Sequence, residues 1–183
     1  LHSLRRRQRQ MCIRDSEPAL LKDLVVELYP LMSDVQAGQF LYRLKIPGAL
    51  MTRALVNLKT ELTALRSDLD EWVGSDVWTQ PHNGPRTLLA KRTKRAISQA
   101  LIRAWRRQTP SVQIEDHTGY ELDLEAWPVD GLPALSADFG HVSALHLSHS
   151  GNAQFPVGFL DRFPNLRILS LKNSHLAELP ASL

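Results

Sequence analysis

The chain has 183 residues, of which 43% are hydrophobic, and a formal net charge of +3. This length and hydrophobic content suffice for a buried core. No apolar run approaches the roughly 18 residues that a membrane helix needs, so we expect no membrane span.

Residues 1–16 form an arginine-rich start that resembles translated sequencing-adapter sequence: Leu4-Arg-Arg-Arg-Gln-Arg-Gln-Met-Cys-Ile-Arg-Asp-Ser16. The alternative is a basic arm for nucleic acid or a membrane surface. We favour a non-native, disordered segment. The net charge of its five arginines and one aspartate is larger than the +3 of the whole chain, so the remaining residues are not basic. The pI of 9.2 is therefore no argument that the rest of the chain binds nucleic acid. It lacks the apolar stretch of a signal peptide and holds Cys12, the only cysteine.

Residues 17–110 are expected to be a helical region. A first helix carries Leu20, Leu24 and Leu28 and ends at Pro30. Ser33 is the expected N-cap of a second helix, which ends at Pro47. A third helix has apolar residues spaced by fours and threes, which places them on one face of a bundle core rather than in a long coiled coil. These residues are Met51, Leu55, Leu58, Leu62, Leu65, Leu69 and Trp72.

A loop is expected over residues 74–84, because Pro81, Asn83 and Gly84 disfavour regular structure. Pro85 then suits the first turn of a fourth helix, which ends at Thr109-Pro110. Its expected inward face consists of Leu89, Thr93, Ile97, Ala100, Leu101, Ala104 and Trp105.

The charges divide sharply at the end of this fourth helix. Eight basic residues and no acid lie on it: Arg86, Lys91, Arg92, Lys94, Arg95, Arg103, Arg106 and Arg107. Acidic residues then accumulate up to Asp161 with no lysine or arginine among them. The basic helix 86–107 could bind nucleic acid. We favour a solvated face partly neutralised by the acidic repeat, because no aromatic residues interleave with the basic ones.

Residues 111–183 contain three repeats, of which the last is expected to be truncated. Pairs of leucines in an L-x-L pattern recur after 23 and then 24 residues: Leu122 and Leu124, Leu145 and Leu147, Leu169 and Leu171. A second anchor keeps the same spacing: Leu132-Pro133, Phe155-Pro156 and Leu179-Pro180. This period and core predict a leucine-rich repeat. The predicted fold is therefore α+β, an N-terminal helical bundle followed by the start of a leucine-rich-repeat solenoid with short parallel strands.

Side chains on a strand alternate, so the neighbours of the inward leucines should point outward. Stacked strands would set them in three rows, namely residues 121-144-168, 123-146-170 and 125-148-172. Such rows form the concave face that solenoids use for ligands. The predicted partner-binding residues are Glu121, Asp123, Glu125, His146, Ser148, Ile168, Ser170 and Lys172.

No residue pattern in the chain indicates catalysis. His141, His146 and His149 match no common zinc-ligand spacing, and we expect ordinary surface histidines. The acidic residues lack the spacing of a calcium loop, and phosphate-loop, serine-elbow and zincin motifs do not occur. We therefore predict no catalytic residue, no metal and no cofactor in this chain.

Several stretches resemble large bacterial leucine-rich-repeat effectors or toxins that end in a novel E3 ubiquitin ligase (NEL) domain. The resemblance rests on Ala104-Trp-Arg-Arg107, Gly119-Tyr-Glu-Leu-Asp-Leu124, Gly131-Leu-Pro-Ala-Leu135, Phe139-Gly-His-Val142, Phe159-Leu160 and Phe163-Pro-Asn-Leu-Arg-Ile-Leu-Ser-Leu171. In that family the repeats recognise a protein target, and a separate C-terminal domain transfers ubiquitin through a cysteine. The resemblance implies secretion into a host cell, a host-protein target, and contact with the ubiquitin-conjugating machinery only through a domain beyond Leu183.

The expected function is thus protein recognition within a larger bacterial effector of this ligase type. The main alternative is a leucine-rich-repeat adaptor or toxin scaffold without an enzyme. A weaker alternative is nucleic-acid binding through helix 86–107.

Overall fold

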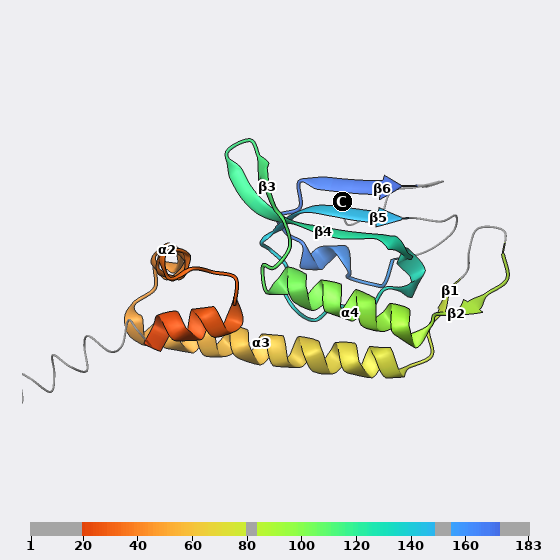
Figure 1. Ribbon diagram of the computed structural model, residues 1–183, viewed down its shortest axis with the longest axis horizontal. Helices are drawn as coiled ribbons and strands as arrows, with labels where there is room; N and C mark the ends of the chain where they lie inside the picture. The colour runs from red at the N-terminus through yellow and green to blue at the C-terminus, as the bar shows by residue number, and fades with distance from the viewer. Residues whose placement is uncertain (1–19, 80–83, 149–154, 173–183) are drawn as a thin grey trace, which may run out of the picture. The chain divides into compact units, whose positions relative to one another are not determined.

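The computed structural model describes residues 20–79, 84–148 and 155–172. The protein is mixed α/β, with helices and two sheets, one of strand order β1-β2 and one of order β3-β4-β5-β6 (Figure 1). It divides into two compact units, Leu1–Thr60 and Glu61–Leu183. Helix α3, Gly48–Gly74, contributes residues to both units.

The first unit contains a helix over residues 20–28, helix α2 (Asp34–Leu44) and the beginning of α3. The predicted breaks at Pro30 and Pro47 are confirmed. Ser33 caps α2 as predicted: its Oγ accepts the Gln36 backbone N–H at 3.3 Å, and Gln36 Oε1 accepts that of Ser33 at 2.9 Å. This reciprocal arrangement satisfies donors that a helix start leaves open.

The buried face of the first helix differs from the predicted one. Leu21, Val25 and Leu28 are buried, whereas Leu20 is 62% exposed. The predicted stripe and the observed buried face share Leu28, and the residues of each have helical spacing. Periodicity alone therefore could not choose between the two faces. Packing selects the face that also carries Val25, which is completely buried.

In the second unit, the helical stripe of α3 and the inward face of α4 are largely confirmed. Leu62, Leu65 and Leu69 of α3 are buried. Helix α4 runs over Lys91–Trp105 and buries Ile97, Ala100, Leu101, Ala104 and Trp105. The prediction that this helix begins at Pro85 is wrong. Strand β2 (Thr87–Leu88) pairs there with β1 (Trp78–Thr79), which lies in the expected loop.

A single carboxylate connects three segments of the second unit. Glu61 Oε1 on α3 accepts the Trp105 indole N–H of α4 at 2.9 Å. The same oxygen accepts the Asp138 backbone N–H at 2.9 Å, in the segment that leads into β5. Hydrogen bonds to a charged group are stronger than neutral ones, so Glu61 fixes these segments to one another.

The four-stranded sheet starts with an antiparallel hairpin and continues in parallel. Strand β3 (Ser111–Ile114) pairs antiparallel with the start of β4 (His117–Pro128), and Glu115 in the turn has φ of 51°. Strands β5 (Val142–Ser148) and β6 (Ile168–Lys172) follow in parallel. The predicted leucine pairs lie side by side in this register: Leu122, Leu145 and Leu169, then Leu124, Leu147 and Leu171.

Gly119 allows β4 to pass close to an irregularity in β5. The pairing of β4 with β5 shifts after Tyr120, where Ser143 is the extra residue. A Cβ atom at Gly119 would lie 1.9 Å from Ser143 Oγ, a distance that no side chain tolerates. The Ser143 hydroxyl is completely buried and lies 3.0 Å from His117 Nε2. A glycine in a strand often marks such a close approach.

In the described residues, short 3₁₀ helices and aromatic rings follow β4 and precede β6. Helix η1 spans Val129–Gly131 after β4, and η2 spans Leu160–Arg162 before β6. The Phe163 ring lies 5.2 Å from that of Phe139 and 5.5 Å from that of Phe159, between ring centroids. All three rings are buried and, with the leucine pairs of β4 and β5, belong to the core. The predicted anchor Leu179-Pro180 lies outside the described residues, as do His149 and residues 1–16.

Candidate interaction face and groove

Two of the three predicted rows on the sheet are confirmed by the strand register. Residues 121, 144 and 168 lie side by side, and so do residues 123, 146 and 170. The third row is only partly right. Ser148 pairs with Lys172 on one side but with Pro128 on the other, because the register of β4 shifts between Leu124 and Pro128.

Ala144 lies in the predicted row but is not exposed as predicted, since only 1% of it is accessible. Its methyl group belongs to the middle strand and is flanked by the longer side chains of Glu121 and Ile168. Neighbouring strands are only about 4.8 Å apart, so long side chains cover a short one between them. Ile168 is 39% exposed and Asp123 is exposed, while Glu121, Glu125, His146, Ser148 and Ser170 are half-buried.

Charged groups on this face form a connected network. His146 Nε2 lies 3.4 Å from Glu121 Oε1, and its Nδ1 lies 3.9 Å from Glu125 Oε1. Lys172 Nζ donates to Glu125 Oε2 at 2.5 Å, and this hydrogen bond raises the pKa of Lys172. Asp123 Oδ1 accepts the Glu125 backbone N–H at 2.9 Å. We call Glu121, Asp123, Glu125, His146, Ser148, Ile168, Ser170 and Lys172 the sheet face.

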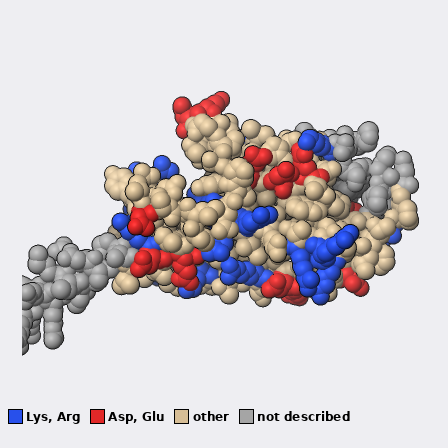
Figure 2. Space-filling model, in the orientation of Figure 1, with Lys and Arg blue, Asp and Glu red and all other residues tan. Residues whose placement is uncertain are grey.

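The sheet face is acidic with one cation at its end. Figure 2 shows red acidic atoms over the strands of the four-stranded sheet and blue basic atoms over α4. Among the described residues, no group of three or more His, Cys, Asp or Glu side chains is arranged to hold a metal ion. The same part of the chain has no helix with the length and apolarity that a membrane crossing demands. The arrangement is suited to contact with another molecule by charge and hydrogen bonding.

His141 is a structural residue and not the surface histidine that was expected. Its Nε2 lies 2.7 Å from the Ala104 carbonyl oxygen, near the C-terminal end of α4. The imidazole ring packs against the rings of Tyr120 and Phe139, at centroid distances of 5.7 and 6.3 Å. Burial, with the nearby positive charge of Arg107, lowers the pKa of His141 to about 4.

The basic helix is exposed at five of its eight basic residues, as expected of a solvated face, and departs from that face most at Lys94. Lys94 is buried, and its Nζ donates to the Ser75 carbonyl oxygen just after α3. Arg86, Lys91, Arg92, Arg95 and Arg103 are exposed. One of the cations that a nucleic-acid surface would use is therefore committed to the contact of α4 with the end of α3.

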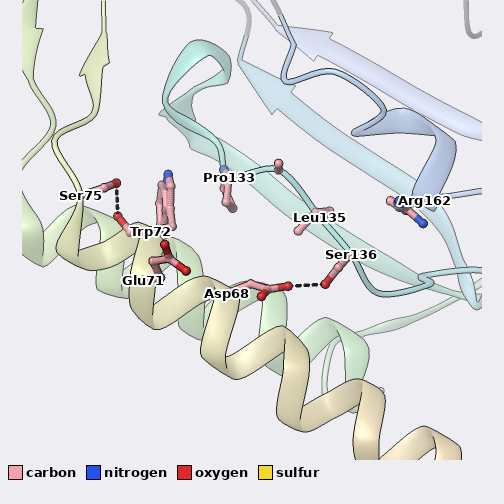
Figure 3. A pocket seen from close by; sticks show the side chains of 9 residues that line it. Asp68, Glu71, Trp72, Ser75, Pro133, Leu135, Ser136 and Arg162 are labelled. Carbon is pink, nitrogen blue, oxygen red and sulfur yellow. Dashed lines mark hydrogen bonds between the residues drawn. The ribbon is translucent and has the colours of Figure 1, made fainter.

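A groove in the second unit was not predicted from the sequence (Figure 3). It has a volume of about 470 Å³. One wall comes from α3 and the residue that follows it, and the other from residues 133–136 and Arg162. The lining residues on the α3 side are Asp68, Glu71, Trp72 and Ser75. Ser136 Oγ donates to Asp68 Oδ2 at 2.5 Å across the groove. The two walls are far apart in sequence, so no local pattern could have revealed them.

Comparisons of the chain with protein-family models, with curated proteins and with solved structures found no match.

Proposed function

We propose that the chain recognises a protein partner through the sheet face, as part of a leucine-rich-repeat array. The observation that supports this proposal most is the alignment of consecutive L-x-L segments, 23 and 24 residues apart, in adjacent parallel strands. Leu122, Leu124, Leu145 and Leu147 are at most 1% exposed, which commits alternate positions of these strands to the core.

Because strand side chains alternate, the remaining positions are repeated on the opposite side of the sheet. Parallel pairing places the equivalent residues of successive repeats side by side. The three strands therefore present one continuous surface to a partner. The network around His146 and Glu125 orders the side chains there before any partner binds. Preordered side chains lose less entropy on binding, which favours recognition.

The acidic character of the face indicates a partner with complementary positive charge. Asp123 is exposed, and Ser170, at the other end of the same row, is half-buried. Complementary charge raises association rates and selects partners more than it adds affinity. We therefore expect binding that weakens as salt concentration rises.

The experiment compares two variants with the same change in charge in a pull-down from host-cell extract. The face variant carries Asp123→Arg and Ser170→Arg, and the control variant carries Asp70→Arg and Ser67→Arg on the exposed side of α3. A protein partner of the sheet face is retained by the wild type and the control but lost from the face variant. Titration of the purified partner should then show at least about tenfold weaker binding for the face variant. Equal retention by both variants would exclude the sheet face.

The resemblance to ligase-type effectors adds a second part to the proposal. The bound partner is then the substrate to which a ligase domain of the larger protein transfers ubiquitin. The rival is an adaptor or toxin scaffold without an enzyme. The open reading frame that contains this chain separates the two. A helical domain after Leu183 with a cysteine followed closely by aspartate supports the ligase. A frame that closes after a few more repeats supports the scaffold.

A further inference from the structure

The groove between α3 and residues 133–136 combines three features that favour a positively charged guest. Its α3 wall carries two carboxylates, Asp68 and Glu71, and the indole ring of Trp72. Figure 3 shows the Trp72 ring standing beside Pro133, with Glu71 and Asp68 following along the same helix. An indole face attracts cations through its quadrupole, and the carboxylates add direct charge attraction.

The position at the end of α3 strengthens this preference. The C-terminal end of a helix carries partial negative charge on its last carbonyl groups. The last turn of α3 contains no basic residue of its own. The protein itself places an ammonium group there, since the buried Lys94 donates to the Ser75 carbonyl oxygen. Lys94 shows that an ammonium group is accepted at this helix end and neutralises part of its charge, so the carboxylates of Asp68 and Glu71 are the main attraction for a guest.

The rest of the groove is apolar and suits an aliphatic chain. Pro133, Ala134 and Leu135 line the wall opposite α3. The volume of about 470 Å³ falls in the range of roughly 300–1,000 Å³ that ligand sites occupy. Lysine has an apolar four-carbon stem that ends in an ammonium group, and such a side chain buries its stem on apolar surface while its head stays polar.

We propose that this groove binds a lysine side chain from an extended segment of a partner protein. The ammonium group lies against Glu71 and Trp72, and its stem packs on Pro133 and Leu135. Asp68 is held in place by Ser136 and contributes charge without moving. The single cation of the lining, Arg162, opposes the guest and keeps the ammonium group on the α3 side. This site is independent of the sheet face.

The test follows the indole N–H signal of Trp72 by NMR in the full chain. The signal is assigned as the one that disappears in Trp72→Phe. The probe is the capped pentapeptide Gly-Gly-Lys-Gly-Gly, and the matched probe has norleucine in place of lysine. The lysine peptide should shift the signal in a saturable way. The norleucine peptide should leave it in place, because it has the apolar stem without the charge.

Substitutions in the groove test which side chains contribute to binding of the lysine peptide. Glu71→Gln should weaken the lysine peptide about threefold and Trp72→Ala about fivefold. Arg162→Ala removes the opposing cation and should strengthen binding about threefold. Asp70→Asn is the matched control, since Asp70 is exposed on α3 but does not line the groove. Glu71 is exposed, so its substitution leaves the core intact even where Trp72→Ala unfolds the protein.

Three results would overturn the proposal. Equal shifts with the norleucine peptide would show an apolar groove without charge selection. Equal affinities for Glu71→Gln and Asp70→Asn would show general attraction by the acidic end of α3. Tighter binding of free spermidine than of the lysine peptide would assign the groove to a small polyamine instead of a protein segment.

Discussion

At the residue scale, His141 has a structural role that the spacing of histidines in the sequence could not indicate. It forms no part of a zinc-ligand pattern, and the sequence therefore suggested a surface residue. The structure uses its ring to hold the Ala104 carbonyl oxygen, 2.7 Å away, near the end of α4. Because the pKa of His141 is lowered to about 4, the imidazole is neutral at pH 7 and its Nε2–H donates to that oxygen. The contact depends on chain segments that meet only in the fold.

The lowered pKa predicts that acid destabilises the protein through His141. The pKa is 6.5 in the unfolded chain and about 4 in the folded protein. The contribution is fully present above pH 6.5 and is lost as the pH falls from 6.5 through 4. This loss amounts to about 3 kcal/mol by pH 4. Urea unfolding of the wild type and of His141→Gln at pH 7.5, 5.5 and 4.5 measures it. The wild type should lose more stability than the variant, and parallel losses would contradict the assignment.

Local signals explain which residues of the fold could be predicted. Ser33 and Pro30 act on neighbouring backbone, so the sequence places their helix ends correctly. Lys94, Gly119 and Ser143 act on segments that are distant along the chain. Lys94 reaches Ser75, and Gly119 leaves room for Ser143. Their roles depend on tertiary contacts that no short window contains.

At the element scale, the parallel strands were predictable and the short antiparallel pairs were not. Two anchors with one spacing placed β4, β5 and β6 and most of their register. Strands β1 and β2 have two residues each, too few to show alternation. Strand β1 lies within the expected loop, and β2 occupies residues expected to be helical, so α4 starts only at Lys91. The candidate groove was missed for a related reason, since its walls come from elements without a shared motif.

The leucines of β5 and β6 should differ in their contribution to stability. Leu145 is completely buried on β5, whereas Leu169 at the same register position on β6 is half-buried. Leu145→Ala should cost about 3–4 kcal/mol, because it leaves a cavity in the core. Leu169→Ala should cost about 1 kcal/mol, because less area is lost from the interior. Chemical denaturation of both variants at pH 7.5 measures the difference, and equal costs would show that β6 is as well buried as β5.

At the scale of the whole molecule, one compact unit contains both helices and strands. The sequence suggested a change of architecture at residue 110. The boundary between the compact units falls at residues 60 and 61, within the sequence of α3, and α4 belongs to the same unit as the four-stranded sheet. The type of an element can be read from its periodicity, but its packing partners cannot. The carboxylate of Glu61, which bonds to α4 and to the segment before β5, is part of what joins these elements.

The two units should open separately in hydrogen exchange. Val25 is completely buried in the first unit. Val25→Ala should lower amide protection in residues 20–60 and leave β4 and β5 within error of the wild type. Side chains pack more extensively within a compact unit than across its boundary, so a defect spreads mainly inside its own unit. Mass spectrometry of exchanged peptides measures this, and equal loss in both units would show a single cooperative structure.

The β3–β4 hairpin has a consequence for how such a gene could change over time. Strand order places β3 at one end of the four-stranded sheet and β6 at the other. Strand β3 is antiparallel to β4 and joined to it by the two residues between Ile114 and His117, so no parallel strand can enter between them. Duplication of a unit of 23 or 24 residues can add strands only after β4. Length variation among descendants should therefore accumulate on one side of the hairpin, which serves as the fixed origin of the sheet.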